Sequence, residues 1–87
     1  MDSRSVEATV QAITKIRDRL DPADPASRAL ASAIEAARNG DPEFAIDDVS
    51  NALHYFKISL QRDDFQALHS AAVEFSMEDC LEWLHVT

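Results

Sequence analysis

Residues that crosslink a chain, turn it sharply or carry it through a membrane are scarce in this sequence. Its 87 residues include one cysteine, one glycine and three prolines. A single cysteine excludes a disulfide within the chain and favours a reducing compartment. No stretch approaches the roughly 18 apolar residues of a membrane span, and the first ten residues, MDSRSVEATV, hold no apolar targeting segment. We therefore expect a cytoplasmic protein that does not enter a membrane.

Basic residues are scarce in the second half of the sequence. Residues 1–40 carry six acids and six bases, whereas residues 41–87 carry ten acids and two bases, so the whole net charge of −8 lies in the second half. Such a field repels nucleic acid and anionic lipid and steers basic proteins toward it. We therefore expect no direct binding to nucleic acid. An acidic surface that imitates nucleic acid toward a basic protein fits the charge.

The side chains that metal binding and catalysis require lack a suitable pattern. His54, His69 and His85 are 15 and 16 residues apart, and Cys80 lies five residues before His85. No two of them have the i, i+3 or i+4 spacing that holds a metal from one helix, although convergence across helices stays open. The single glycine excludes a glycine-rich phosphate loop. We therefore expect no enzyme activity, no catalytic residue, no metal and no cofactor.

The distribution of apolar residues indicates helices. Apolar residues make up 46% of the chain and charged residues 28%, which is the composition of a globular protein. Helical periodicity covers residues 5–20, 25–38, 42–56, 62–75 and 77–86. The stretch KISL, residues 57–60, favours a short extended crossing that buries Ile58 and Leu60 and is too short to form a sheet. We predict an all-α fold, a compact four- to five-helix bundle with short loops, in one domain spanning residues 1–87.

Polar residues and prolines mark the predicted helix ends. Asp24–Pro25 and Asp41–Pro42 match an N-cap followed by the first helical residue, and Ser5 is a third candidate N-cap. Gly40 can adopt the left-handed conformation that closes a helix. The stretch SMED, residues 76–79, matches a capping box in which its serine and aspartate exchange hydrogen bonds at the start of the last helix.

Four acids lie at or near the start of the third predicted helix. Asp41 and Glu43 fall at its cap and in its first turn, where an acid stabilises the helix dipole by about 0.3 to 1 kcal/mol. Asp47 and Asp48 lie beyond that turn and have no lysine or arginine at i+3 or i+4. Uncompensated charge of this kind commonly serves solubility. Two interpretations therefore stay open, a solvated surface and a binding surface for a basic partner.

The last predicted helix carries the only cysteine and the only tryptophan. Cys80 falls on an apolar stripe with Met77, Leu81 and Leu84, and is most simply a small core residue. Trp83 falls off that stripe. It lies either at the edge of the core or in an interface, where tryptophan is enriched among the residues that carry binding energy.

The stretch GDPEFAIDDVSNALHYFKISLQRDDFQALHSAAVEFSME resembles the MafI-type group of bacterial immunity proteins, of the kind found in contact-dependent growth inhibition. The resemblance lies in an acidic helix from Glu43 to Leu53, the bend KISL, and a helix that opens with QRDDF and continues to Leu68, with a late Met77. Members of this group are small helical proteins that bind and neutralise a secreted toxin domain, often a nuclease. The resemblance implies cytoplasmic residence, no catalysis and one tight cognate partner.

Charge and resemblance together predict an inhibitor that occludes the basic active site of a toxin C-terminal domain. Its carboxylates would take the place of phosphates. The predicted contact residues are Asp47, Asp48, Asn51, His54, Tyr55, Asp63, Asp64, Glu74 and Trp83. Two alternatives stay open. One is a helical interaction or regulatory module, including a homo-oligomer whose acidic surface serves solubility, and the other is an adaptor that displays Trp83 to an apolar helix.

Overall fold

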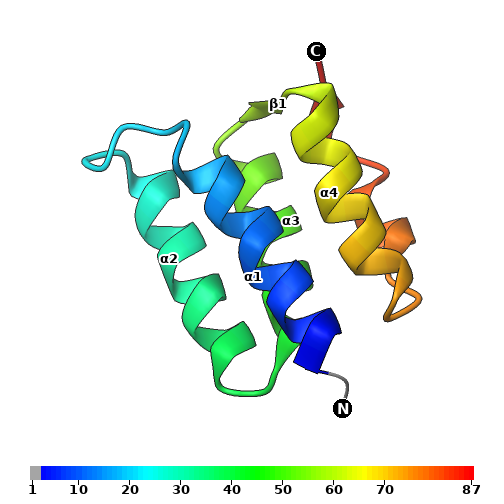
Figure 1. Cartoon of the computed structure of the whole chain (residues 1–87). Helices are drawn as coiled ribbons and strands as arrows, with labels where there is room; N and C mark the ends of the chain where they lie inside the picture. Colours follow the sequence, from blue (N-terminus) through cyan, green and yellow to red (C-terminus); the bar gives the residue numbers. More distant parts are fainter. Residues whose placement is uncertain (1–2) are drawn as a thin grey trace.

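The helices of this protein alternate in direction and pack side by side. The computed structural model describes residues 3–87. Within that range the α-helices are α1 (Ser3–Arg17), α2 (Pro25–Arg38), α3 (Pro42–Tyr55) and α4 (Arg62–Val73). Helix α2 packs against α1 and α3, and α4 packs against α1 on the side away from α2 (Figure 1). The predicted all-α bundle with short loops is confirmed.

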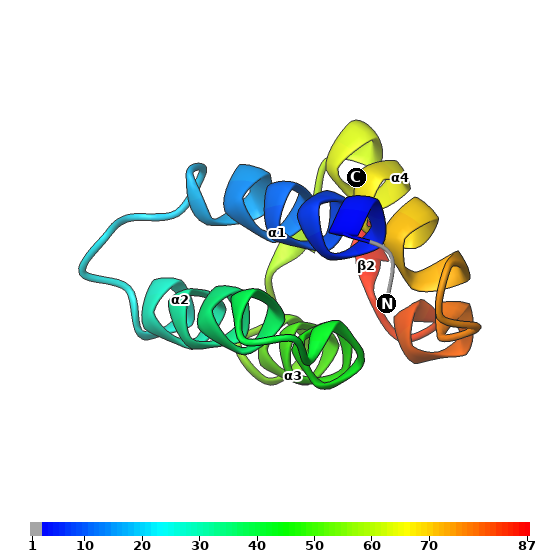
Figure 2. The same cartoon turned by 60° about the horizontal axis from the view of Figure 1, so that its bottom comes forward.

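The chain after α4 does not form the helix that the sequence predicts over residues 77–86. It forms the short 3-10 helix η1 (Glu78–Leu81) and the strand β2 (His85–Val86). Strand β2 pairs in parallel with β1 (Ser59–Leu60), with Ser59 opposite His85 and Leu60 opposite Val86. Parallel strands need a long crossover between them, and here α4 provides it. The C-terminal segment, residues 78–87, thus lies on the α4 side of the molecule, away from α2 (Figure 2).

The Asp-Pro pairs begin two helices as predicted. Asp24 accepts a hydrogen bond from the backbone N–H of Ala26 at 2.9 Å, and Asp41 accepts one from Phe44 at 3.3 Å. Each proline takes the first helical position, where its missing N–H costs nothing. The prediction that Ser5 caps the first helix is wrong. Ser5 lies inside α1, and its carbonyl accepts the hydroxyl of Thr9 at 2.9 Å.

Three helices end in the same backbone motif. Gly40 after α2, Lys57 after α3 and Ser76 after α4 have φ angles of 90°, 55° and 57°. After each of them the next backbone N–H returns to a carbonyl five residues earlier, as in Ile58 to Leu53 at 2.9 Å and Met77 to Ala72 at 2.9 Å. This is the Schellman motif. The predicted capping box at residues 76–79 is therefore wrong, because Ser76 closes α4 and no side chain caps η1.

The core lies where α1, α2 and α3 meet α4 and the C-terminal segment. Its largest buried apolar side chains are Ile13, Ile16, Leu30, Ile46, Val49, Leu53, Leu60, Leu68 and Leu81. Burial of one such side chain stabilises the fold by about 1.5 to 3 kcal/mol. The side chains of Phe56, Phe65 and Phe75 lie at the edge of this core and are only partly buried. Ile58 and Cys80 are likewise only partly buried.

We predict that Ser76→Gly stabilises the protein. A non-glycine residue in the left-handed region costs about 1 to 2 kcal/mol, while glycine adds about 0.5 to 1 kcal/mol of unfolded-state entropy. The net gain in the free energy of unfolding is therefore about 0.5 to 1 kcal/mol, measured by urea denaturation. Ser70→Gly, at an exposed position inside α4, is the matched control and should destabilise. A loss of stability in Ser76→Gly would contradict the assignment of Ser76 as the residue that closes α4.

Candidate protein-binding surface

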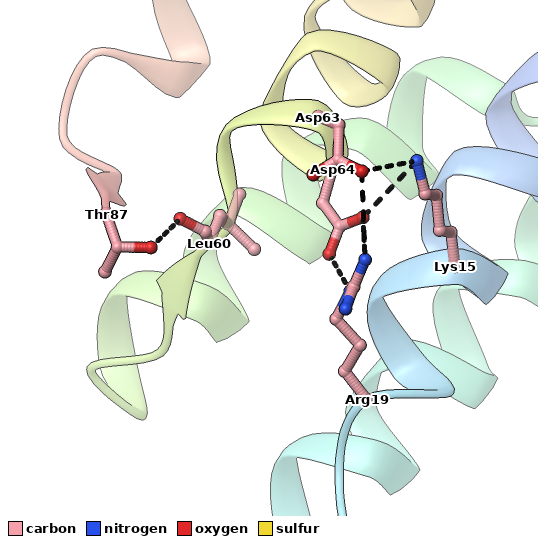
Figure 3. A network of polar contacts seen from close by, with 6 residues as sticks. All are labelled: Lys15, Arg19, Leu60, Asp63, Asp64 and Thr87. Carbon is pink, nitrogen blue, oxygen red and sulfur yellow. Dashed lines mark hydrogen bonds and ion pairs between the residues drawn. The ribbon is translucent and has the colours of Figure 1, made fainter.

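The acids at the start of α4 are paired with cations from the first half of the chain. Asp64 is 1% exposed, and its two carboxylate oxygens face Arg19, with Nε 2.5 Å from Oδ2 and Nη2 donating to Oδ1 at 3.3 Å. Lys15 lies 3.6 Å from Asp64 and 3.4 Å from the exposed Asp63 (Figure 3). The contact at Oδ2 is an ion pair without the geometry of a hydrogen bond, so charge alone compensates this buried oxygen.

This cluster changes the predicted contact surface. Asp64 is inaccessible, so the prediction that it contacts a partner is wrong. Asp63 remains exposed, but Lys15 and Arg19 both lie within 4 Å of it. Its own backbone N–H and then the charge of Lys15 lower the pKa of the Asp63 carboxyl. Both acids also lie in the first turn of α4, where Gln61 supplies no side-chain cap and negative charge stabilises the helix dipole.

The acids of α3 beyond its first turn have no such compensation. Asp47 is exposed, Asp48 is partly exposed, and among residues 3–87 no lysine, arginine or histidine pairs with either. Partial burial, and then the neighbouring charge of Asp47, raise the pKa of the Asp48 carboxyl. A raised carboxyl pKa means that the folded protein holds this negative charge at a cost. We call Asp47 and Asp48 the acidic pair of α3.

Two large aromatic side chains are exposed near the C-terminal end of α3. Trp83 is 75% exposed and Tyr55 is 78% exposed. The ring of Tyr55 forms a T-shaped contact with the ring of Phe56, with ring centroids 4.9 Å apart. Of the two interpretations of Trp83, the core position is wrong, and a role in an interface stays a prediction. Exposed tryptophan is uncommon on a monomer surface and frequent in interfaces.

Trp83 stands over a groove between α3 and the C-terminal segment. Two adjoining hollows of about 390 Å³ each share Trp83 and His54 in their linings. The first hollow is completed by Ser50, Asn51 and Cys80. The second is completed by Leu53, Lys57, Ile58, Ser59, Leu84 and His85. We call the two hollows together the Trp83 groove.

The structure thus brings some predicted contact residues together and separates others. Asn51, His54 and Trp83 meet in the Trp83 groove, and the acidic pair of α3 lies one turn before Asn51 on the same helix. Tyr55 is exposed but does not line the groove. Asp63 and Glu74 lie at opposite ends of α4, and neither lines the groove.

Sequence reasoning missed Lys57 and His85 as neighbours of Trp83. The helix predicted over residues 77–86 gives no reason to place His85 near the end of α3. In the structure, the pairing of β2 with β1 brings His85 there. The left-handed conformation of Ser76, which closes α4 before η1, carries no sequence signal comparable with glycine. The proximity of Lys57 and His85 to Trp83 could therefore be recognised only from the structure.

The residues that the structure describes include neither a cluster suited to a metal ion nor a helix that could span a membrane. Over residues 3–87 no three histidine, cysteine, aspartate or glutamate side chains converge in a way that could hold a metal ion. None of the helices described is long and apolar enough to cross a membrane. Comparisons of this chain with protein-family models, curated proteins and solved structures found no match.

We predict that Asp64→Asn destabilises the protein by about 2 kcal/mol, because loss of one partner leaves the other charge of a buried pair uncompensated. The expected loss of stability is below the range for fully buried pairs, because Arg19 is 41% exposed and water can solvate its charge. Urea denaturation measures it, with Asp63→Asn, which removes the same charge at the exposed neighbouring position, as the control. Equal small losses in both variants would contradict the structural role of Asp64.

We predict that Asp48→Asn stabilises the protein at neutral pH. The folded-state pKa of Asp48 is raised, so its contribution to stability is present below the unfolded value of 3.8 and lost as the pH rises through the folded value. The gain at pH 7 is below about 0.5 kcal/mol because the side chain is screened by water.

The pH dependence of this effect separates it from a packing effect. The gain in Asp48→Asn should shrink as the pH falls toward 3.8. Asp63→Asn should behave oppositely, because the lowered pKa of Asp63 stabilises the fold above its unfolded value and that stability is lost on acidification. Thermal denaturation of both variants between pH 4 and 7 measures this. A gain in Asp48→Asn that is independent of pH would contradict the electrostatic cause.

Proposed function

We propose that this protein is an immunity protein that binds a secreted bacterial toxin domain, a nuclease, and neutralises it by occluding its basic active site. The observation that carries the proposal is the acidic pair of α3, which is uncompensated within residues 3–87 and lies one turn before Asn51 of the Trp83 groove. Lys15 and Arg19 are engaged at Asp63 and Asp64, and neither pairs with Asp47 or Asp48. The excess negative charge on α3 is therefore free to meet a basic partner.

Electrostatics supports a basic partner in two ways. The field of residues 41–87, with ten acids and two bases, attracts a cationic surface and raises its association rate. In the complex, a lysine or arginine beside Asp48 would relieve the unfavourable charge that raises the pKa of this carboxyl. The free protein bears this cost, and a cationic partner removes it on binding.

The contact surface that we propose is smaller than the one the sequence predicts. It comprises Asp47, Asp48, Asn51, His54, Tyr55 and Trp83, while Asp64 is excluded by burial and Asp63 and Glu74 lie apart on α4. Nanomolar binding requires about −12 kcal/mol, and a few central residues commonly supply most of it. Trp83 has the exposed area for such a role, and the acidic pair of α3 supplies charge and specificity.

A second candidate is an interaction module that binds through its aromatic residues. The exposures of Tyr55 and Trp83, 78% and 75%, favour it. It predicts binding that changes little with salt, because apolar contacts are not screened. An inhibitor with an acidic contact surface should bind more weakly as salt increases, because salt screens charged contacts. In a homo-oligomer, the binding would be between copies of the chain.

We predict that Asp47→Asn with Asp48→Asn weakens toxin binding. The partner tested is the product of the toxin reading frame directly upstream, and calorimetry at low and high salt measures the affinity. We expect a loss of about 10- to 100-fold at low salt, which shrinks at high salt. The matched control, Glu7→Gln with Asp18→Asn, removes two exposed charges, one within α1 and one directly after it, and should change the affinity less than about threefold.

Two outcomes would overturn the proposal. No binding of the upstream product by the unchanged protein would remove the immunity function. Binding that responds equally to the α3 variant and to the α1 control would mean that net charge, and not the surface on α3, determines affinity. Salt-independent binding with no effect of either variant would favour the interaction module.

A further inference from the structure

The Trp83 groove has two chemically different halves. The half completed by Ser50, Asn51 and Cys80 has no lysine or arginine in its lining. The other half contains Lys57 and His85 above an apolar floor that includes Ile58 and Leu84. A cationic ligand would be repelled by Lys57 in the second half and not in the first.

The first half presents hydrogen-bond acceptors. The hydroxyl of Ser50 donates to the carbonyl of Asp47 at 2.9 Å, which leaves the lone pairs of its oxygen to accept. Asn51 contributes a side-chain carbonyl, and a neutral His54 contributes one ring nitrogen as an acceptor. Within residues 3–87, neither side chain forms a hydrogen bond in the free protein. The acceptors of this half are available to a donor from outside.

Acidic residues are close in the chain to the residues that line the same half. Asp47 lies four residues before Asn51, one turn away on the same face of α3. Along the C-terminal segment, the exposed Asp79 precedes Cys80 and the exposed Glu82 precedes Trp83. Lysine and arginine are absent from the lining of this half, whereas Lys57 lines the other half. The charge near the first half therefore favours a cation.

We propose that the first half of the Trp83 groove binds an arginine side chain of the partner, stacked on the indole of Trp83 and hydrogen-bonded to Asn51. This inference rests on the proposed function and names the group that the toxin inserts. A guanidinium is planar, stacks on an indole face and carries five donors in a fixed fork, so it uses the aromatic wall and the acceptors together. A lysine ammonium is a strongly hydrated point charge and uses the aromatic wall less well.

Trp83 itself reports on the test, because it is the only tryptophan in the chain. The probes are blocked pentapeptides, identical except for a central arginine, lysine, citrulline or leucine. Citrulline has nearly the shape of arginine without its charge. We expect the arginine peptide to change Trp83 fluorescence in a saturable way, the lysine peptide to bind at least threefold more weakly, and the citrulline and leucine peptides to bind more weakly still. Equal or stronger binding of the citrulline or leucine peptide would overturn the inference.

Two variants locate the binding. Asn51→Ala, at an exposed helical position, should weaken arginine-peptide binding at least threefold, whereas Gln66→Ala, exposed on α4, should leave it unchanged. Trp83→Leu should weaken toxin binding at least tenfold, with circular dichroism to show that the fold is kept. Full toxin binding by Trp83→Leu would overturn this inference and leave the immunity function standing. Arginine-peptide binding without any toxin binding would support the groove and overturn the proposed function.

Discussion

The ion pair between Arg19 and the buried Asp64 holds the two halves of this protein in register. Asp64 belongs to the first turn of α4, and Arg19 follows the end of α1, so the pair fixes where α4 begins against α1. Strand β1 directly precedes α4, and β2 pairs with it, with Thr87 donating to the carbonyl of Leu60 at 2.8 Å through its backbone and at 3.1 Å through its hydroxyl (Figure 3). The position of Trp83, two residues before β2, therefore depends on an ion pair whose nearer member in the chain, Asp64, lies 19 residues before it.

The parts of the fold that could be predicted from the sequence are those with a local chemical signal. The start of α2, its end and the start of α3 are marked by Asp24–Pro25, Gly40 and Asp41–Pro42, respectively. The signals are side-chain capping, proline geometry and glycine conformation, and the structure confirms them. The region after α4 lacks such signals. Apolar residues at helical spacing over residues 77–84 predict a helix, but the chain forms the short 3-10 helix η1, and β2 then pairs with a strand 26 residues earlier. Non-local pairing of two-residue strands has no periodicity to detect.

The candidate surface shows the same division between local and tertiary information. Sequence reasoning could select Asp47 and Asp48 because the absence of a cation at i+3 or i+4 is local, and within residues 3–87 the structure pairs no cation with either of them. Sequence reasoning could not distinguish this acidic pair from Asp63 and Asp64. The cations that compensate those two acids, Lys15 and Arg19, lie more than forty residues away in the chain. The position of Trp83 beside Asn51 and His54 also required the fold. The charge of the second half is thereby divided into a structural part on α4 and an available part on α3.

Hydrogen exchange of the protein, free and mixed with the toxin domain proposed as its partner, tests the proposed surface most directly. Binding through the surface proposed here should slow exchange of backbone amides in residues 47–57 of α3 and its end, and in residues 79–86 of the C-terminal segment. Residues 3–17 of α1 and the start of α4 should exchange at the same rate in both states. The acids at the start of α4, Asp63 and Asp64, already form ion pairs with Lys15 and Arg19. Protection confined to α1 or α4, with α3 unchanged, would contradict the account.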